Sequence, residues 1–186
     1  METSGRELFT IGHSTRSLED LLRLLRAFHI AHLADVRTIP RSRHTPQFNR
    51  ETLKVDLPKA ALQYVHLPLL GGLRKSPGKG SPNSGWHNAS FRGFADYMQT
   101  DEFARGLDEL WALAGQVRTA MMCAEALYWR CHRALIADAF TIRGGTVHHI
   151  LSDLKVETHR VTSFAVVTDG HITYPPPPRV QPSLLT

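Results

Sequence analysis

Short apolar runs alternate along the chain with segments in which apolar residues recur every three or four positions. The runs are rich in β-branched and aliphatic residues and predict five strands, at 8–11, 32–37, 62–67, 118–122 and 147–150. The segments with helical spacing predict helices at 18–28, 91–98, 103–114 and 134–140. Ser17 and Asp20 resemble a capping box at the start of the first helix, and Gly115 predicts the end of the third.

Strands that alternate with helices indicate an α/β domain, because each helix returns the chain to begin a parallel strand. We therefore expect a single domain over residues 1–174, with a mainly parallel, Rossmann-like sheet of about five strands and helices on both faces. The segments 161–167 and 171–174 flank Thr168-Asp169-Gly170, which is typical of a hairpin. The proline-rich residues 175–186 are expected to form a C-terminal tail outside the domain.

The composition fits a globular protein, with 186 residues of which 42% are hydrophobic, and the formal net charge is +5. This positive excess favours anionic partners such as phosphate esters, nucleotides or nucleic acid, and a solvated basic surface is the alternative. Two cysteines are too few for a disulfide framework and favour a reducing compartment. The sequence shows no signal-peptide pattern and no apolar run of membrane-spanning length, so we expect a cytoplasmic protein without membrane contact.

Chemically active side chains concentrate around the fourth predicted strand. This strand runs into Cys123 and Glu125, and the next helix opens with Cys131, His132 and Arg133. The carboxyl ends of parallel strands share one edge of the sheet, and ligands bind at that edge. Other polar side chains fall at the same predicted edge, namely His13, Ser14, Asp35, Arg37, His66 and His149.

Polar and aromatic residues near this edge each have two interpretations. Asp35 could bind ribose hydroxyls, or it could form an ion pair with Arg37 that shapes the loop. The basic loop at 38–49 contains two prolines and Phe48, which could stack on a base or pack on the core. The segment 73–90 is rich in Gly, Pro and Ser and predicts a lid or a binding loop.

The leading hypothesis is an enzyme that uses Cys123 as a nucleophile on an anionic, nucleotide-like or phosphorylated substrate. Nearby positive charge would favour the thiolate, Glu125 could act as general acid or base, and His13 or His132 could carry the proton. Substrate and anion binding are assigned to further side chains at this edge: Ser14, Asp35, Arg37, Arg41, Arg133 and His149. The alternative for Cys123 is an inert buried thiol.

Two other functions remain open at this stage. In the first, Glu125 and Asp35 attack or stabilise a sugar C1 in nucleoside or ribosyl chemistry, while Cys123 only packs. In the second, the protein is a nucleotide or nucleic-acid binding module without catalysis, which uses the loops at 37–50 and 73–90. Such a module would bind in a salt-sensitive manner, because each phosphate contact releases counterions.

A zinc site on Cys123, Cys131 and His132, with His13 as a further candidate ligand, is disfavoured by the sequence. The Cys-x7-Cys-His spacing matches none of the usual zinc motifs. If Cys131 and His132 lie on a helix, their adjacent side chains diverge by about 100°. The sequence therefore predicts neither a metal nor a cofactor.

One set of motifs extends over most of the chain: Thr10-Ile11-Gly12-His13-Ser14, Asp35-Val36-Arg37, Pro40-Arg41-Ser42, Leu70-Gly71-Gly72, Phe91–Met98, Met122-Cys123-Ala124-Glu125, Cys131-His132-Arg133 and Val147-His148-His149-Ile150. Together they resemble the family catalogued as domain of unknown function 488. The resemblance spans Thr10 to about His159 and implies a bacterial or archaeal cytosolic α/β protein with no settled activity. Residues 126–130 depart from the family, in which an acid or a proline is frequent there.

Overall fold

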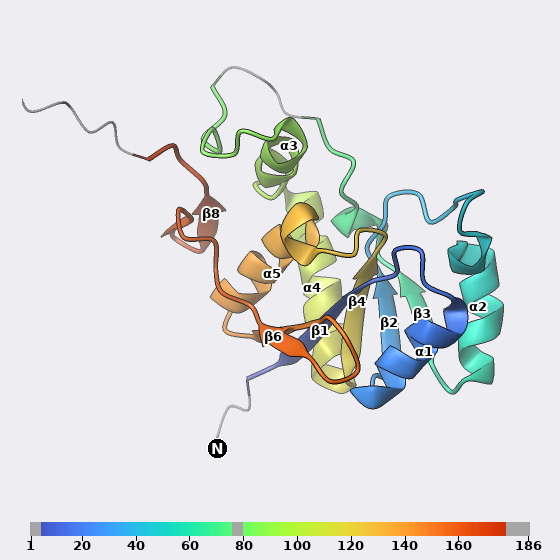
Figure 1. The fold of residues 1–186 in the computed structure, drawn as a ribbon. Coiled ribbons are helices and arrows are strands. Elements are labelled where there is room, and N and C mark those ends of the chain that lie inside the picture. The colour runs from blue at the N-terminus through green and yellow to red at the C-terminus, as the bar shows by residue number, and fades with distance from the viewer. Residues whose placement is uncertain (1–4, 76–79, 178–186) are drawn as a thin grey trace, which may run out of the picture.

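The computed structural model describes residues 5–75 and 80–177 and contains a central sheet with helices on both faces (Figure 1). The sheet consists of β1 (Glu7–Gly12), β2 (His32–Asp35), β3 (Gln63–His66), β4 (Thr119–Cys123), β5 (Thr146–Ile150) and β6 (Val156–Thr158). The strand order is β3-β2-β4-β1-β5-β6, with β6 antiparallel to β5 and the other pairs parallel. The predicted α/β domain is confirmed, and β6 is an edge strand that the sequence did not predict.

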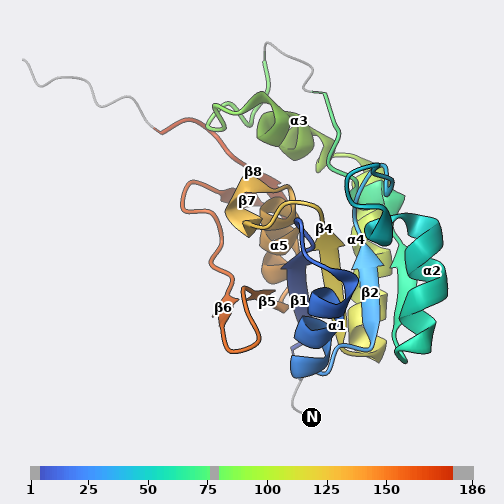
Figure 2. The ribbon, with the colours of Figure 1, turned by 45° about the vertical axis from the view of Figure 1, so that its right-hand side comes forward.

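The helices are α1 (Leu18–Ala27), α2 (Arg50–Lys59), α3 (Ala89–Tyr97), α4 (Asp101–Gln116) and α5 (Arg133–Ile142). Three short 3₁₀ turns are η1 (Pro46–Phe48), η2 (Pro68–Leu70) and η3 (Tyr128–Arg130). The helices α1 and α2 cover one face of the sheet, and α4 and α5 cover the other (Figures 1 and 2). As predicted, the Ser17 hydroxyl caps α1 by accepting a hydrogen bond from the Asp20 N–H.

The chain reverses its direction across the sheet after β3. It steps from β1 to β2 to β3 one way, then returns to β4 and crosses β1 to reach β5. Because crossovers between parallel strands are right-handed, helices after the reversal lie on the opposite face. The connections that follow β1 and β4 therefore lead to helices on opposite faces of the sheet, and ligands bind at such a reversal point in open α/β sheets.

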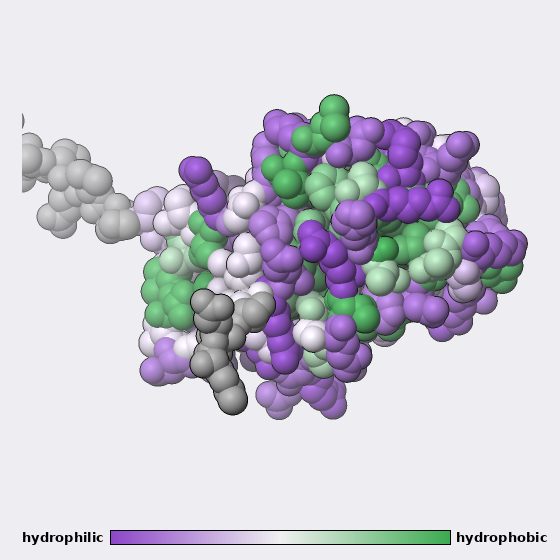
Figure 3. Space-filling view, turned by 90° about the horizontal axis from the view of Figure 1, so that it is seen from below, coloured by the Kyte–Doolittle hydropathy of each residue, from purple (hydrophilic) through white to green (hydrophobic). Residues whose placement is uncertain are grey.

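Alternation along the strands divides the core into two clusters. On β4, Ala120 and Met122 face α1 and α2, whereas Met121 and Cys123 belong to the cluster packed by α4 and α5. Cys123 is therefore directed to the face on which α5 begins. Figure 3 shows the molecule from below, the side on which the parallel strands begin. This surface is covered mainly by hydrophilic side chains, with small apolar patches between them.

Two helical features differ from expectation. The sequence did not predict α2, whose buried residues are Leu53 and Leu57, because so few apolar positions give a weak periodic signal. Gly115 does not end its helix, since α4 continues to Gln116. A Cβ atom at Gly115 would lie 2.8 Å from Cζ of Arg6, so glycine there permits close packing of a guanidinium.

The predicted C-terminal hairpin is present but shorter than expected. It consists of β7 (Val166–Thr168) and β8 (His171–Thr173), which form a separate two-stranded sheet. Asp169 and Gly170 have φ angles of 51° and 80°, as a tight hairpin turn requires. Of the proline-rich segment 175–186, residues 178–186 lie outside the described residues. Among the helices that the structure describes, none has the length and apolar character needed to cross a bilayer.

Candidate functional site

A cavity of about 620 Å³ opens at the carboxyl ends of β1, β2 and β4. Its lining comes from the loops after these strands, from the segment after η2, and from the starts of α3 and α5. It brings together the following predicted site residues: His13, Ser14, Arg37, Cys123, Glu125 and His132. It does not include five others that we placed at the edge: Asp35, Arg41, His66, Arg133 and His149.

The ends of β1 and β4 remain paired beyond the strands themselves. Gly12 is in register with Cys123, and the N–H groups of His13 and Ser14 donate to the carbonyls of Cys123 and Ala124, each at 2.9 Å. A Cβ atom at Gly12 would lie 2.0 Å from the Glu125 carbonyl oxygen. The absence of a side chain at Gly12 therefore allows the chain after β4 to cross the end of β1.

Asp35 and Arg37 form a buried ion pair beneath the cavity wall. The Arg37 Nε and Nη2 groups donate to the two oxygens of Asp35 at 2.9 and 2.6 Å. The Tyr64 hydroxyl also donates to Asp35, and Arg37 Nη2 donates to the Phe48 carbonyl. Of the two interpretations of Asp35, the ion pair is confirmed. Phe48 is fully buried and packs on the core, so that alternative is confirmed as well.

His13 is held in one neutral form. Its Nδ1–H donates to the Ser14 carbonyl at 2.9 Å, and its Nε2 accepts from Arg37 Nη1 at 3.2 Å. The ring is stacked on Phe48, with centroids 4.3 Å apart. Burial, reinforced by the charge of Arg37, lowers the pKa of His13 to about 4. Both ring nitrogens are thus occupied at neutral pH.

Cys123, Cys131 and His132 form a compact cluster in the cavity wall. The Cys131 sulfur lies 3.6 Å and the Cys123 sulfur 4.0 Å from His132 Nδ1. Cys131 has extended backbone angles, and His132 is the N-cap of α5, so neither residue lies within the helix. The condition on which their side chains were expected to diverge is therefore not met.

The two thiols influence each other directly. A hydrogen bond from Cys123 lowers the pKa of Cys131 well below its ordinary value, and the charge of Arg133 lowers it further. The same hydrogen bond, together with burial, raises the pKa of Cys123. Negative charge is therefore favoured on Cys131, the residue that the sequence analysis considered only as a metal ligand.

Arg133 supplies a buried positive charge behind this cluster. Its side chain is 1% exposed and donates to the Thr10 hydroxyl and to the Glu125 carbonyl. Within the described ranges no carboxylate lies within ion-pair distance of it, and its Nε–H has no hydrogen-bond partner. A buried cation is costly unless negative charge is near, so this guanidinium favours anions at the cluster.

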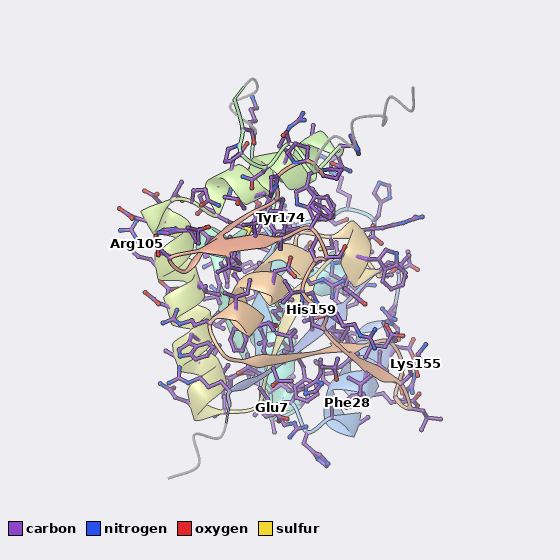
Figure 4. All side chains as sticks on the ribbon, turned by 90° about the vertical axis from the view of Figure 1, so that its left-hand side faces the viewer. Glu7, Phe28, Arg105, Lys155, His159 and Tyr174 are labelled. Carbon is purple, nitrogen blue, oxygen red and sulfur yellow. The ribbon has the colours of Figure 1, made fainter. Side chains whose placement is uncertain are left out.

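His149 belongs to a buried chain of hydrogen bonds on the α5 side of the sheet. Its Nδ1 is hydrogen-bonded to the Thr10 hydroxyl at 2.7 Å, and its Nε2 lies 2.9 Å from Nδ1 of His159. His159 in turn donates to Asp138, which also accepts from the Tyr174 hydroxyl; His159 and Tyr174 are labelled in Figure 4. The ring of His149 is stacked on Tyr128 at 3.5 Å. This chain positions Thr10 and Arg133 and is separate from the cavity lining.

The cavity also contains residues that the sequence analysis did not select. Arg130 is exposed in the lining and has no ion-pair partner in the part of the chain that the structure describes. Phe91, near the start of α3, lines the cavity. Ile39 and Leu73 lie at the rim of the cavity and are 65% and 73% exposed. Exposed apolar residues beside a cavity are a signal that only the tertiary structure provides.

Comparison with known proteins gives one match. No curated protein and no solved structure is similar to the chain. A family model matches residues 17–140, which is more than half of the chain and includes Cys123, Cys131 and His132. In agreement with the motifs in its sequence, the chain belongs to the family described as Domain of unknown function DUF488.

Proposed function

We propose that this protein is an enzyme that binds a small anionic substrate in the cavity and acts on it with the cluster of Cys123, Cys131 and His132. The observation that carries this proposal is that a thiol–imidazole cluster opens into a cavity lined by Arg130, with the buried guanidinium of Arg133 behind it, and neither arginine has an ion-pair partner among the described residues. Glu125, exposed in the same lining, is available as general acid or base. The chemistry would be hydrolysis or group transfer in a reducing, cytoplasmic setting, where both free thiols persist.

Positive charge at the cavity favours a phosphorylated or otherwise anionic group. Within residues 5–75 and 80–177, Arg130 has no ion-pair partner and Arg133 has no carboxylate within ion-pair distance. Arg37 uses four of its five N–H groups in the contacts described above. The fifth N–H, on Nη1, remains available at the cavity wall. An anion placed here would neutralise charges that the folded chain leaves uncompensated.

An apolar part of the substrate would lie against the apolar part of the cavity lining. Ile39, Leu73 and Phe91 line this part of the cavity, whose volume suits a nucleotide-sized molecule. We therefore propose a nucleotide-like substrate, with its phosphate toward Arg130 and its base or other organic group toward Leu73. His13, whose nitrogens are both occupied, is assigned a positioning role through Arg37.

The proposal is tested by calorimetric titration with inorganic phosphate, a pentose phosphate and a nucleoside monophosphate. We expect saturable binding that Arg130→Gln weakens by at least about tenfold, as loss of one charged contact implies. Arg105→Gln is the control, because Arg105 is an exposed arginine on α4 (Figure 4) that does not belong to the cavity lining. Absence of binding, or an equal effect of both substitutions, would refute the anion site.

Catalysis is tested separately on the ligands that bind. Cys131→Ser and Cys123→Ser should abolish turnover while the calorimetric affinity remains within about threefold of the wild type, because serine preserves the cavity shape. A wild-type protein that binds these ligands but converts none of them would favour the non-catalytic module. In that case affinity should fall steeply with salt, since phosphate contacts release counterions.

A further inference from the structure

The donor atoms of Cys123, Cys131 and His132 have the mutual spacing of a metal site. The two sulfurs and Nδ1 all lie within 4.8 Å of one another, and among the described residues they form the only such group of three metal-ligating side chains. Zinc bonds of ordinary length in a tetrahedron place sulfur and nitrogen about 3.6 Å apart. The two observed sulfur–nitrogen distances, 3.6 and 4.0 Å, are close to this value before any ion is bound.

His132 is oriented as a ligating histidine should be. Its Nε2 donates to the Val36 carbonyl at 3.0 Å, because a carbonyl can only accept. The proton of the neutral ring is therefore on Nε2, and the lone pair of Nδ1 is directed at the two sulfurs. Metal-ligating histidines commonly donate their other N–H to a backbone carbonyl in this way, which fixes tautomer and ring orientation.

The three ligands come from two segments, the end of β4 and the connection before α5. Cys123 is the last residue of β4, and Cys131 and His132 lie between η3 and α5. His132 also packs against Phe94 of α3, with ring centroids 5.0 Å apart. A ligand set that is held before the ion arrives requires little reorganisation on binding.

We propose that Cys123, Cys131 and His132 bind one thiophilic divalent transition-metal ion, with zinc as the first candidate. Binding displaces to solvent the proton or protons that the two sulfurs still carry, so that two thiolates balance the charge of the ion. Two thiolates and one imidazole match the preference of zinc among the divalent ions. Three protein ligands leave a fourth position, as in catalytic rather than structural zinc sites.

The fourth position is directed to the cavity, because all three ligands line it. The neighbouring polar side chains of the lining do not complete the set: Nε2 of His13 is engaged by Arg37, and Glu125 lies outside the group of three. Resting on the proposed function, this inference makes the ion a Lewis acid for the bound anion or for a water molecule. The cluster would then act through the metal rather than as a free thiol nucleophile.

The test is anaerobic titration of the reduced, full-length protein with Co²⁺, followed by displacement with Zn²⁺. We expect one equivalent of Co²⁺ to bind, with thiolate-to-cobalt charge-transfer absorption and intense tetrahedral visible bands. Cys123→Ser and Cys131→Ser should each remove about half of the charge-transfer intensity. Each should weaken binding by more than about 100-fold, since loss of an outer contact alone costs 10- to 100-fold.

His132→Gln should also weaken Co²⁺ binding, and His87→Gln is its matched control because His87 is exposed and outside the cavity lining. If a cysteine variant does not fold, the proposal is still tested on the wild-type protein, by the number of Co²⁺ ions bound per chain and by competition with a chromophoric chelator for Co²⁺. No stoichiometric binding, or an octahedral spectrum without charge transfer, would overturn the proposal.

The experiment separates this inference from the proposed function. Adding inorganic phosphate to the cobalt-loaded protein should shift the visible bands if an anion reaches the fourth position. Metal binding without any effect of anions would sustain the metal site and refute the anionic substrate. Anion binding and cysteine-dependent turnover in a protein that does not bind Co²⁺ would sustain the enzyme and refute the metal site.

Discussion

Gly72 and His132 are in such close contact that no side chain can be placed between them. A Cβ atom at Gly72 would lie 2.4 Å from Nδ1 and 2.7 Å from Cγ of His132. The imidazole cannot move aside freely, because its other nitrogen donates to the Val36 carbonyl and its ring packs on Phe94. The segment after η2 therefore determines where Nδ1 of His132 lies.

Gly72→Ala should displace the His132 ring and weaken Co²⁺ binding by roughly 10- to 100-fold, the usual cost of disturbing a ligand's support. Titration of the reduced protein with Co²⁺ measures this effect. Gly145→Ala is the control, because its Cβ would crowd Phe140 near the opposite end of α5, at 2.2 Å. Equal metal affinity in Gly72→Ala and the wild type would show that the ring is not held by this contact.

Gly12→Ala should destabilise the whole domain, because its Cβ would meet the Glu125 backbone rather than a flexible side chain. Overpacking of this kind costs about 3 kcal/mol or more where the backbone must shift. Urea denaturation gives the difference in unfolding free energy. Gly5→Ala, whose Cβ would make only an ordinary contact at 3.5 Å, should leave stability nearly unchanged. A Gly12→Ala loss no larger than that of Gly5→Ala would contradict the crossing geometry.

Asp35→Asn should cost about 3–5 kcal/mol of unfolding free energy, because it leaves the buried Arg37 guanidinium without its counter-ion. Tyr64→Phe removes one hydrogen bond to the same carboxylate and should cost only about 1 kcal/mol. Chemical denaturation at neutral pH distinguishes the two variants. Equal losses would mean that Asp35 and Arg37 are not coupled as an ion pair.

Acid should destabilise the protein through its buried histidines. Burial lowers the pKa of His149 to about 3, whereas an unfolded histidine titrates near its ordinary value of 6.5. Below that value the unfolded chain binds the proton and the folded chain does not. Stability is therefore complete above about pH 6.5 and falls on acidification, by up to about 1.4 kcal/mol per pH unit for each such histidine.

His149→Asn should reduce this slope, measured as unfolding free energy by urea denaturation between pH 7 and 5.5. His13, whose pKa burial lowers to about 4, should maintain the remaining slope in the variant. His29→Asn is the control, since His29 is exposed and its φ of 53° suits asparagine. A His149→Asn slope equal to that of the wild type would contradict the assigned protonation.

The apolar rim predicts a difference between ligands. Leu73→Ser should weaken binding of a nucleoside monophosphate by about five- to tenfold, because the ligand would no longer bury part of a leucine side chain. Binding of inorganic phosphate should be unchanged. Leu154→Ser is the control, because Leu154 is 95% exposed and lies outside the cavity lining. Calorimetry with both ligands measures the effect. Equal weakening of phosphate and nucleotide would remove Leu73 from the recognition of the organic group.

Local pattern was sufficient for most of the architecture. Short apolar runs marked the five parallel strands, and the helical spacing of apolar residues marked α1, α3, α4 and α5. α1 and α4 bury one stripe, whereas α5 is buried from Arg133 to Phe140. The weak stripe of α2, with Leu53 and Leu57, gave too little signal, and Gly115 reflects packing against Arg6 instead of a helix end.

The sequence by itself determined that polar side chains gather at the carboxyl edge, since parallel strands place their ends together. It could not determine on which side of the sheet each one lies. Thr10 and His149 pair beneath the edge, and Arg133 lies buried behind the cluster. Only the tertiary structure decided that Cys131 and His132 face Cys123. This arrangement depends on the extended backbone of Cys131 before α5, and on the Val36 carbonyl after β2, which accepts a hydrogen bond from His132 although it is 96 residues away in sequence.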